Sequence, residues 1–103
     1  MALVKLAAHK AMDGAPPMAG PVAMTVSATY LVPKSWPKKR VAAALWRTAK
    51  PDADNIAKLV TDACNEIVFE DDAQVAELTV QKRYGPLAGV TVSVASLEDG
   101  GAI

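Results

Sequence analysis

Two short acidic clusters in the middle of the chain have residue types and a spacing suited to chemistry. Asp52 and Asp54 lie two residues apart, and Asp71 and Asp72 follow an apolar segment. Carboxylates this close repel one another unless a positive charge lies between them, and hard divalent cations prefer oxygen ligands. Lys58 follows Asp54 by about one helical turn. A metal ion beside a lysine indicates chemistry on phosphate, whose negative charge must be neutralised.

Asp52 and Asp54 have two competing interpretations. In an extended segment, residues two apart point to the same side, so both carboxylates could bind one ion. Aspartate is also a favoured helix cap, and Pro51 with an aspartate nearby is typical of a helix start. A cap needs only one of the two, which modestly favours a metal site. A calcium loop is excluded, because it would require an oxygen ligand and a glycine where the chain has Ile56 and Ala57.

The second cluster and the lysine also have plain structural interpretations. Asp71 and Asp72 could form a polar turn between two strands. Lys58 could pair along a helix with Asp54 and Asp62, an interaction worth roughly a few tenths of a kcal/mol. In the functional interpretation, its ammonium group lies on a phosphate oxygen. Whether the two acidic clusters meet depends on the fold.

Charge is distributed unevenly along a chain whose formal net charge is zero. One segment contains basic residues and no acidic ones: Lys34, Lys38, Lys39, Arg40, Arg47 and Lys50. From Asp52 to Glu77 there are eight acidic residues and one basic residue, Lys58. A basic arm beside an acidic pocket suits an enzyme that binds a polyanion and cuts it with a metal ion. On charge alone, two ordinary solvated surfaces are the simpler interpretation.

Two tryptophans, Trp36 and Trp46, flank Lys38, Lys39 and Arg40 in the middle of this basic segment. Such residues are more often anchors of a core or a turn than stacking platforms for nucleobases, although stacking is compatible with them. Cys64 is the only cysteine, so an internal disulfide is excluded. It lies on the apolar face of a predicted helix, where a small buried hydrophobe is a better interpretation than a nucleophile.

The length of 103 residues and the apolar fraction of 51% predict one folded domain over residues 1–103. No apolar run is long enough to cross a bilayer, and the N-terminal segment lacks the uninterrupted apolar core of a signal peptide. We therefore expect a cytoplasmic protein with no membrane partner.

Hydrophobic periodicity predicts the elements that must position these residues. They are a helix at 2–12, a strand at 22–32, a helix at 38 to about 46, a helix from 52 or 54, and strands at 75–84 and 90–94. In the first helix, Leu3, Leu6 and Ala7 have helical spacing. The strand at 22–32 alternates with a period of two. The helix from 52 or 54 has one buried apolar stripe, made of Ile56, Leu59, Val60, Ala63, Cys64 and Ile67. Residues 85–89 form a loop of hairpin length, and residues 98–103 are expected to be a frayed tail.

Several segments carry a family resemblance when they are taken together. They are Lys50-Pro51-Asp52-Ala53-Asp54-Asn55-Ile56-Ala57-Lys58, then Asp62-Ala63, then Phe69-Glu70-Asp71-Asp72-Ala73-Gln74-Val75, and finally Lys82-Arg83-Tyr84-Gly85. In this order and at this separation, they resemble the RusA family of Holliday-junction resolvases, with the last segment similar to phage and prophage members. The resemblance covers roughly residues 20–96.

The resemblance implies a small homodimeric crossover junction endodeoxyribonuclease. Such enzymes use Mg²⁺, with Mn²⁺ as a possible substitute, to cut four-way DNA junctions by paired symmetrical incisions in DNA recombination and repair. Asp52, Asp54 and Asp72 match the metal-binding aspartates, Asp71 a less critical neighbour, and Lys58 the catalytic lysine. The basic segment from Lys34 to Lys50 is the expected DNA-binding arm. No organic cofactor is expected.

We therefore predict an α+β domain of two layers, with a mixed β-sheet and helices on one face, that forms a homodimer. Family members usually begin with an extra strand, which this chain is expected to lack; its absence would expose a sheet edge. Two other functions stay open. One is a non-catalytic DNA-junction-binding protein that keeps the fold but has lost activity through its short N-terminus. The other is a metal- or partner-binding domain without a nucleic-acid role.

Overall fold

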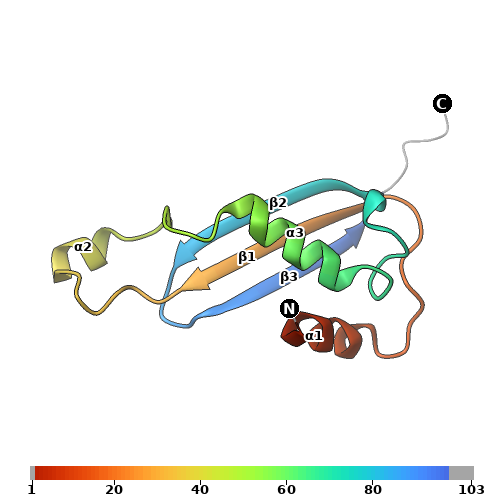
Figure 1. The fold of residues 1–103 in the computed structure, drawn as a ribbon, viewed down its shortest axis with the longest axis horizontal. Helices are drawn as coiled ribbons and strands as arrows, with labels where there is room; N and C mark the ends of the chain where they lie inside the picture. Colours follow the sequence, from red (N-terminus) through yellow and green to blue (C-terminus); the bar gives the residue numbers. More distant parts are fainter. Residues whose placement is uncertain (1, 98–103) are drawn as a thin grey trace.

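The computed structural model describes residues 2–97 and has a three-stranded sheet with helices packed on one face (Figure 1). The elements are α1 (Ala2–Met12), β1 (Val22–Tyr30), α2 (Lys38–Ala43), α3 (Ala53–Cys64), the 3-10 helix η1 (Asp72–Gln74), β2 (Val75–Tyr84) and β3 (Gly89–Ser96). The predicted α+β class with a mixed sheet is confirmed. The tail expected at 98–103 lies outside the described residues.

Strand β1 lies at the centre of the sheet, between β2 and β3. It is parallel to β2 and antiparallel to β3. Its alternate residues, Val22 to Ala28, are almost completely buried on the helical side, which confirms the predicted period of two. The strand ends at Tyr30, before the predicted residue 32, because β2 ends at its partner Tyr84 and residues 31–32 pair with no strand in the described part of the chain.

The loop after β2 is not a hairpin, contrary to its length. Strands β2 and β3 occupy opposite edges of the sheet, so residues 85–88 cross over the end of β1. The edges are about 10 Å apart, a distance that a short extended segment can span. The crossing is close: the Gly85 amide donates to Tyr30 O at 3.0 Å, and a Cβ on Gly85 would lie 2.7 Å from Thr29 Cγ2. Loop length alone could not reveal the strand between them.

Helix α3 supplies the main cover of the sheet. Ile56, Val60 and Cys64 lie on its buried stripe and join the β1 side chains and Phe69 in one core. The predicted stripe is therefore confirmed for these residues. Leu59, assigned to the same stripe, is 48% exposed.

Helix α1 has the predicted bounds but a different buried face. Ala8 is buried, and Val4 and Met12 pack against the core on the same face, four residues apart. Leu3 and Leu6, whose spacing suggested the buried face, are 82% and 60% exposed. Both sets have helical spacing, and only the packing against the rest of the fold selects between them.

Residues 31–52 form an arm that extends beyond the end of the sheet and carries α2 (Figure 1). Helix α2 ends at Ala43, three residues before the predicted end. The reason is a tertiary contact: the Tyr84 amide donates to Leu45 O at 2.9 Å, and the Arg47 amide donates to Lys82 O at 3.0 Å. The returning chain pairs with the edge of β2 there, and this pairing replaces further helical hydrogen bonds.

Candidate functional site

Two cationic side chains hold the main chain that leads into α3. Lys82, half-buried on β2, donates from Nζ to Ala49 O at 2.8 Å and to Pro51 O at 2.7 Å. Arg47 donates from a guanidinium nitrogen to Lys50 O at 2.6 Å. Hydrogen bonds from charged donors are stronger than neutral ones. They fix the loop that presents the first acidic cluster.

The first acidic cluster lies at the start of α3, and its side chains do not cap the helix. Asp52 occupies the N-cap position but makes no side-chain capping hydrogen bond. Its carboxylate instead pairs with Lys50 Nζ at 3.0 Å. Asp54 is exposed in the first helical turn. Negative charge is favourable at a helix N-terminus. The capping interpretation of these two aspartates therefore does not account for their side chains.

The second acidic cluster forms the turn into β2, and Gln74 holds it in place. Asp71 caps η1 by accepting a hydrogen bond from the Ala73 amide at 2.9 Å, while Gln74 Oε1 accepts from the Asp71 amide at 2.8 Å. The same side chain donates from Nε2 to Met18 O and Gly20 O, both at 2.8 Å. The turn is thereby tied to the segment that enters β1.

Asp71 and Asp72 differ in their proton affinity although both are exposed. The hydrogen bond from the Ala73 amide lowers the pKa of Asp71, and a side-chain hydrogen bond with Asp72 lowers it further. That shared hydrogen bond is the main reason why the pKa of Asp72 is raised, and the nearby charges of Asp71 and Asp62 add to it. Of the two carboxylates, Asp72 is therefore the first to take up a proton as the pH falls.

The two acidic clusters lie at opposite ends of α3. Asp72 feels the charge of Asp62 near the end of the helix, whereas Asp52 and Asp54 are at its start. From residue 52 to residue 62 the helix rises about 15 Å. Residues 2–97 contain no group of three or more His, Cys, Asp or Glu side chains that could hold a metal ion. A cation bound by all three predicted ligands therefore does not fit within one chain.

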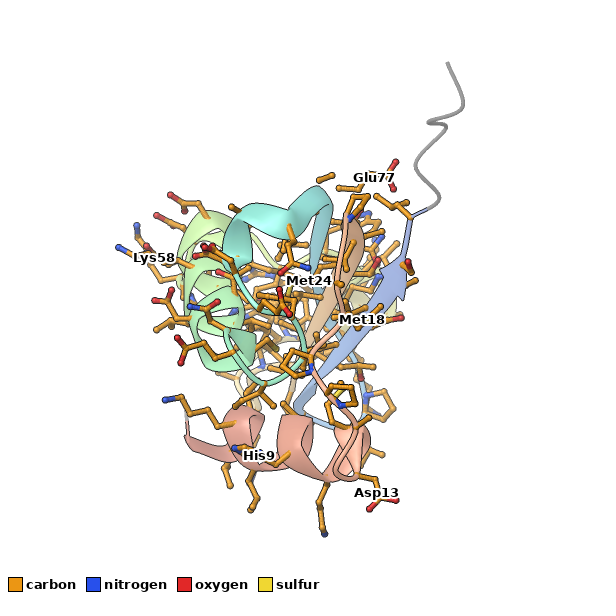
Figure 2. The ribbon with its side chains drawn as sticks, turned by 90° about the vertical axis from the view of Figure 1, so that its right-hand side faces the viewer. His9, Asp13, Met18, Met24, Lys58 and Glu77 are labelled. Atoms are coloured by element: carbon orange, nitrogen blue, oxygen red, sulfur yellow. The ribbon has the colours of Figure 1, made fainter. Side chains whose placement is uncertain are left out.

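Lys58 points from the middle of α3 into solvent, away from the sheet (Figure 2). Asp54 and Asp62 lie one turn before and after it, but neither forms an ion pair with it in the described part of the chain. The structural interpretation of Lys58 as a helix-pairing residue is thus not realised. Its ammonium group is exposed beside the first cluster.

The six basic residues of the arm divide into engaged and exposed side chains. Arg40 stacks on Trp36, with the guanidinium carbon 3.7 Å from the ring centroid, and Arg47 lies 4.1 Å over Tyr30. Lys50 pairs with Asp52. The side chains of Lys34, Lys38 and Lys39 are exposed and form no ion pair with the residues that the structure describes. These three are the positive charges of the arm that have neither an ion-pair nor an aromatic partner among the described residues.

Sequence reasoning missed the positioning roles of Lys82 and Gln74. Both occur in the segments that carry the family resemblance, so the residues themselves were in view. Their partners are 31 to 56 residues away along the chain, and only the fold brings them together. For Lys82, the available signal in the sequence was its place between Val80 and Tyr84 in the apolar alternation of the strand at 75–84, where a cation requires polar partners.

Burial settles the role of Cys64. Its side chain is 2% exposed in the core beneath α3, and desolvation raises the pKa of the thiol. A raised thiol pKa disfavours the nucleophilic thiolate. The prediction of a buried hydrophobe is confirmed.

Comparison with known proteins identifies the family. The sequence profile described as endodeoxyribonuclease RusA matches residues 1–95. The chain belongs to the RusA endodeoxyribonuclease family. It is also similar to YqaN, an uncharacterised protein of Bacillus subtilis (strain 168), with 40% identity over 81 residues. That match spans 73% of this chain and 57% of YqaN, so this chain corresponds to just over half of the relative's length. No solved structure matches the chain.

Membership of the RusA family confirms the resemblance drawn from the acidic and basic motifs. Within residues 2–97, no helix is both long and apolar enough to cross a membrane. The predicted site residues occupy three places: Asp52 lies in the loop before α3, Asp54 and Lys58 on the exposed side of α3, and Asp72 in the turn that contains η1.

Proposed function

We propose that this protein is a structure-specific endodeoxyribonuclease that resolves four-way DNA junctions by paired phosphodiester cleavage. The observation that carries the proposal is the pair of exposed aspartates at the start of α3. These carboxylates do not cap the helix, and they lie directly after a basic arm. Such an arm is suited to hold a DNA backbone, and the acidic cluster lies where a phosphate of that backbone would be cut. Membership of the RusA family supports the same activity.

We propose Mg²⁺, with Mn²⁺ as a substitute, as the metal of this site. Asp52 and Asp54 can supply two carboxylates, but Asp72 lies near Asp62, towards the other end of α3, and no group of three such ligands forms among the described residues. Mg²⁺ binds its ligands at about 2.0–2.1 Å, so no single ion spans that separation. Within residues 2–97 of a single chain the metal set is incomplete, and the proposal requires a second copy of the chain.

A homodimer with a two-fold axis near the middle of α3 would complete the set. Such an axis brings the start of one helix towards the end of the other, and hence Asp54 of one copy towards Asp72 of the second. Leu59 on α3 and Leu78 on β2 are 48% and 46% exposed, which leaves apolar surface for this contact. A two-fold dimer also presents two equivalent sites to the two equivalent strands of a junction.

Each group of this chain then has a role of its own. Lys58 offsets negative charge on the scissile phosphate from the exposed side of α3. Lys82 and Arg47 hold the loop that presents Asp52. Lys34, Lys38 and Lys39 contact flanking phosphates. The biological setting that we propose is DNA recombination and repair in the cytoplasm.

Asp54→Asn tests the activity directly. We expect the variant to bind a synthetic four-way junction with affinity within about threefold of the wild type, because the arm is unchanged. Cleavage in magnesium should fall by at least about a hundredfold, since the isosteric amide removes the charge that the site requires. Gel-based cleavage and binding assays measure the two quantities. Unchanged cleavage by the variant would contradict the assignment of Asp54. If the wild-type protein itself binds the junction but does not cleave it, the protein is a non-catalytic junction-binding protein.

A further inference from the structure

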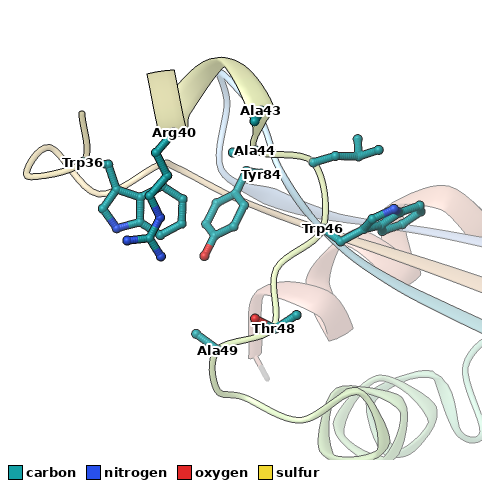
Figure 3. Close-up of a pocket in the computed structure, with 9 residues that line it drawn as sticks. Trp36, Arg40, Ala43, Ala44, Trp46, Thr48, Ala49 and Tyr84 are labelled. Carbon is teal, nitrogen blue, oxygen red and sulfur yellow. The ribbon is translucent and has the colours of Figure 1, made fainter. Parts of the chain in front are cut away.

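A cavity of about 510 Å³ lies at the base of the arm, between α2 and the chain that returns to α3 (Figure 3). Trp36, Arg40 and Tyr84 line one side, and Thr48 and Ala49 line the other. The volume falls within the range of about 300–1,000 Å³ that is typical of small-ligand pockets. None of the residues that line it is acidic.

The aromatic side of the cavity is built as a stacking platform. The rings of Trp36 and Tyr84 meet edge to face, with centroids 5.1 Å apart and an interplanar angle of 64°. The Arg40 guanidinium lies over the Trp36 face at 3.7 Å. Aromatic rings and guanidinium planes are the surfaces on which proteins stack unpaired nucleobases. Three such planar groups, those of Trp36, Arg40 and Tyr84, line the cavity.

A purely structural role explains part of this cluster. Trp36 and Tyr84 anchor the arm to the end of the sheet, as expected for tryptophan at a turn. An anchor does not require the adjoining cavity, nor an arginine that is exposed to solvent while stacked at the cavity wall. Trp46, by contrast, turns its ring away from the other three groups (Figure 3). The Arg83 guanidinium carbon lies 4.8 Å from the centroid of this ring.

The cavity is close to the first acidic cluster. Its wall residue Ala49 precedes Asp52 by three positions, so their Cα atoms are at most about 11 Å apart. A DNA strand rises about 3.4 Å per nucleotide, so this separation corresponds to about three nucleotides. Lys38 and Lys39 on α2 are exposed nearby and can neutralise the flanking phosphates.

We propose that this cavity binds one unpaired nucleobase of branched DNA, within a few nucleotides of the phosphate at Asp52 and Asp54. The proposal rests on the proposed function, because it assumes that branched DNA is the substrate. Charge complementarity favours a nucleotide over a neutral ligand, and the planar wall favours its base over its phosphate. Binding an unpaired base would help the protein to hold the crossing point of a junction open.

Two four-way junctions that differ at one unpaired nucleotide test the proposal. One carries an unpaired thymine at the crossing point, and the other carries an abasic nucleotide there, so charge and pairing are equal. Without magnesium, the wild type should bind the thymine junction about tenfold more tightly, as expected when one base stacks. Arg40→Ala and Trp36→Ala should each reduce this preference to less than twofold.

Lys39→Ala is the matched control, because it should weaken binding to both junctions equally and keep the tenfold ratio. Arg40→Ala keeps the contact between Trp36 and Tyr84, so it is informative even if Trp36→Ala unfolds the arm. Equal wild-type affinity for the two junctions would overturn the base pocket while leaving junction binding intact. If the wild type binds neither junction, the proposed function fails, and the base pocket fails with it.

Discussion

At the scale of single residues, Gln74 shows how one side chain can position a functional turn. Its amide makes one hydrogen bond to the Asp71 main chain and two to the segment before β1. Both ends of the amide are satisfied, and the partners come from parts of the chain far apart in sequence. The aspartates of the turn are therefore held by a neighbour that has no chemical role of its own.

Replacing Gln74 should cost stability. Gln74→Ala removes three hydrogen bonds at about 0.5–1.5 kcal/mol each, reduced by partial exposure, so we expect the free energy of unfolding to fall by about 2 kcal/mol. Chemical denaturation monitored by circular dichroism measures the change. Gln81→Ala on β2 is the control, because Gln81 is also half-buried. If both variants unfold at the same denaturant concentration, the proposal that the Gln74 hydrogen bonds stabilise the turn is wrong.

The sequence was sufficient to find the acidic residues but not to define their surroundings. Spacing singled out Asp52 and Asp54 and left helix capping open, because a cap and a metal ligand use the same residue type. The ion pair of Asp52 with Lys50 and the absence of a side-chain cap came only from the structure. The sequence indicates which residues can do chemistry. Whether the Asp52 carboxylate caps the helix or pairs with Lys50 depends on the geometry of the fold.

At the scale of elements, prediction succeeded where an element depends on its own pattern. The alternation of β1 and the stripe of α3 follow from side chains within the element. It failed where contacts with another element determine the structure. Helix α2 ends early because residues 45–47 pair with β2, and residues 85–88 cross over β1 instead of forming a hairpin. Both errors concern contacts between segments distant in sequence, which periodicity cannot report.

The arm is the element whose role is most directly measurable. Replacing Lys38 and Lys39 with alanine should weaken junction binding and reduce the slope of log K against log salt concentration by about 2. For each phosphate contact that is lost, about 0.9 fewer counterions are released when the protein binds DNA. Fluorescence anisotropy over a salt series measures the slope.

The matched control replaces Lys5 and Lys10, two exposed lysines of α1, outside the arm. This variant has the same net charge as the arm variant. An equal effect of both pairs would mean that overall charge, not the arm, sets the affinity.

At the scale of the whole molecule, the length of α3 is the decisive quantity. It separates Asp52 from Asp62, the helix residue whose charge acts on Asp72, by about 15 Å along the helix axis. Family membership supports a nuclease, and the described part of one chain holds no complete metal group. Both observations are compatible if each site combines Asp52 and Asp54 of one copy with Asp72 of a second.

Subunit mixing tests this central claim most directly. Asp54→Asn and Asp72→Asn should each abolish cleavage as homodimers. Co-expressed with different affinity tags and purified as a heterodimer, they should recover cleavage of one strand, because one of the two shared sites then contains only native aspartates. The product is a nicked junction, resolved from the intact one on a denaturing gel. A wild type that cleaves and a heterodimer that remains inactive would contradict the shared site and assign all three aspartates to one chain.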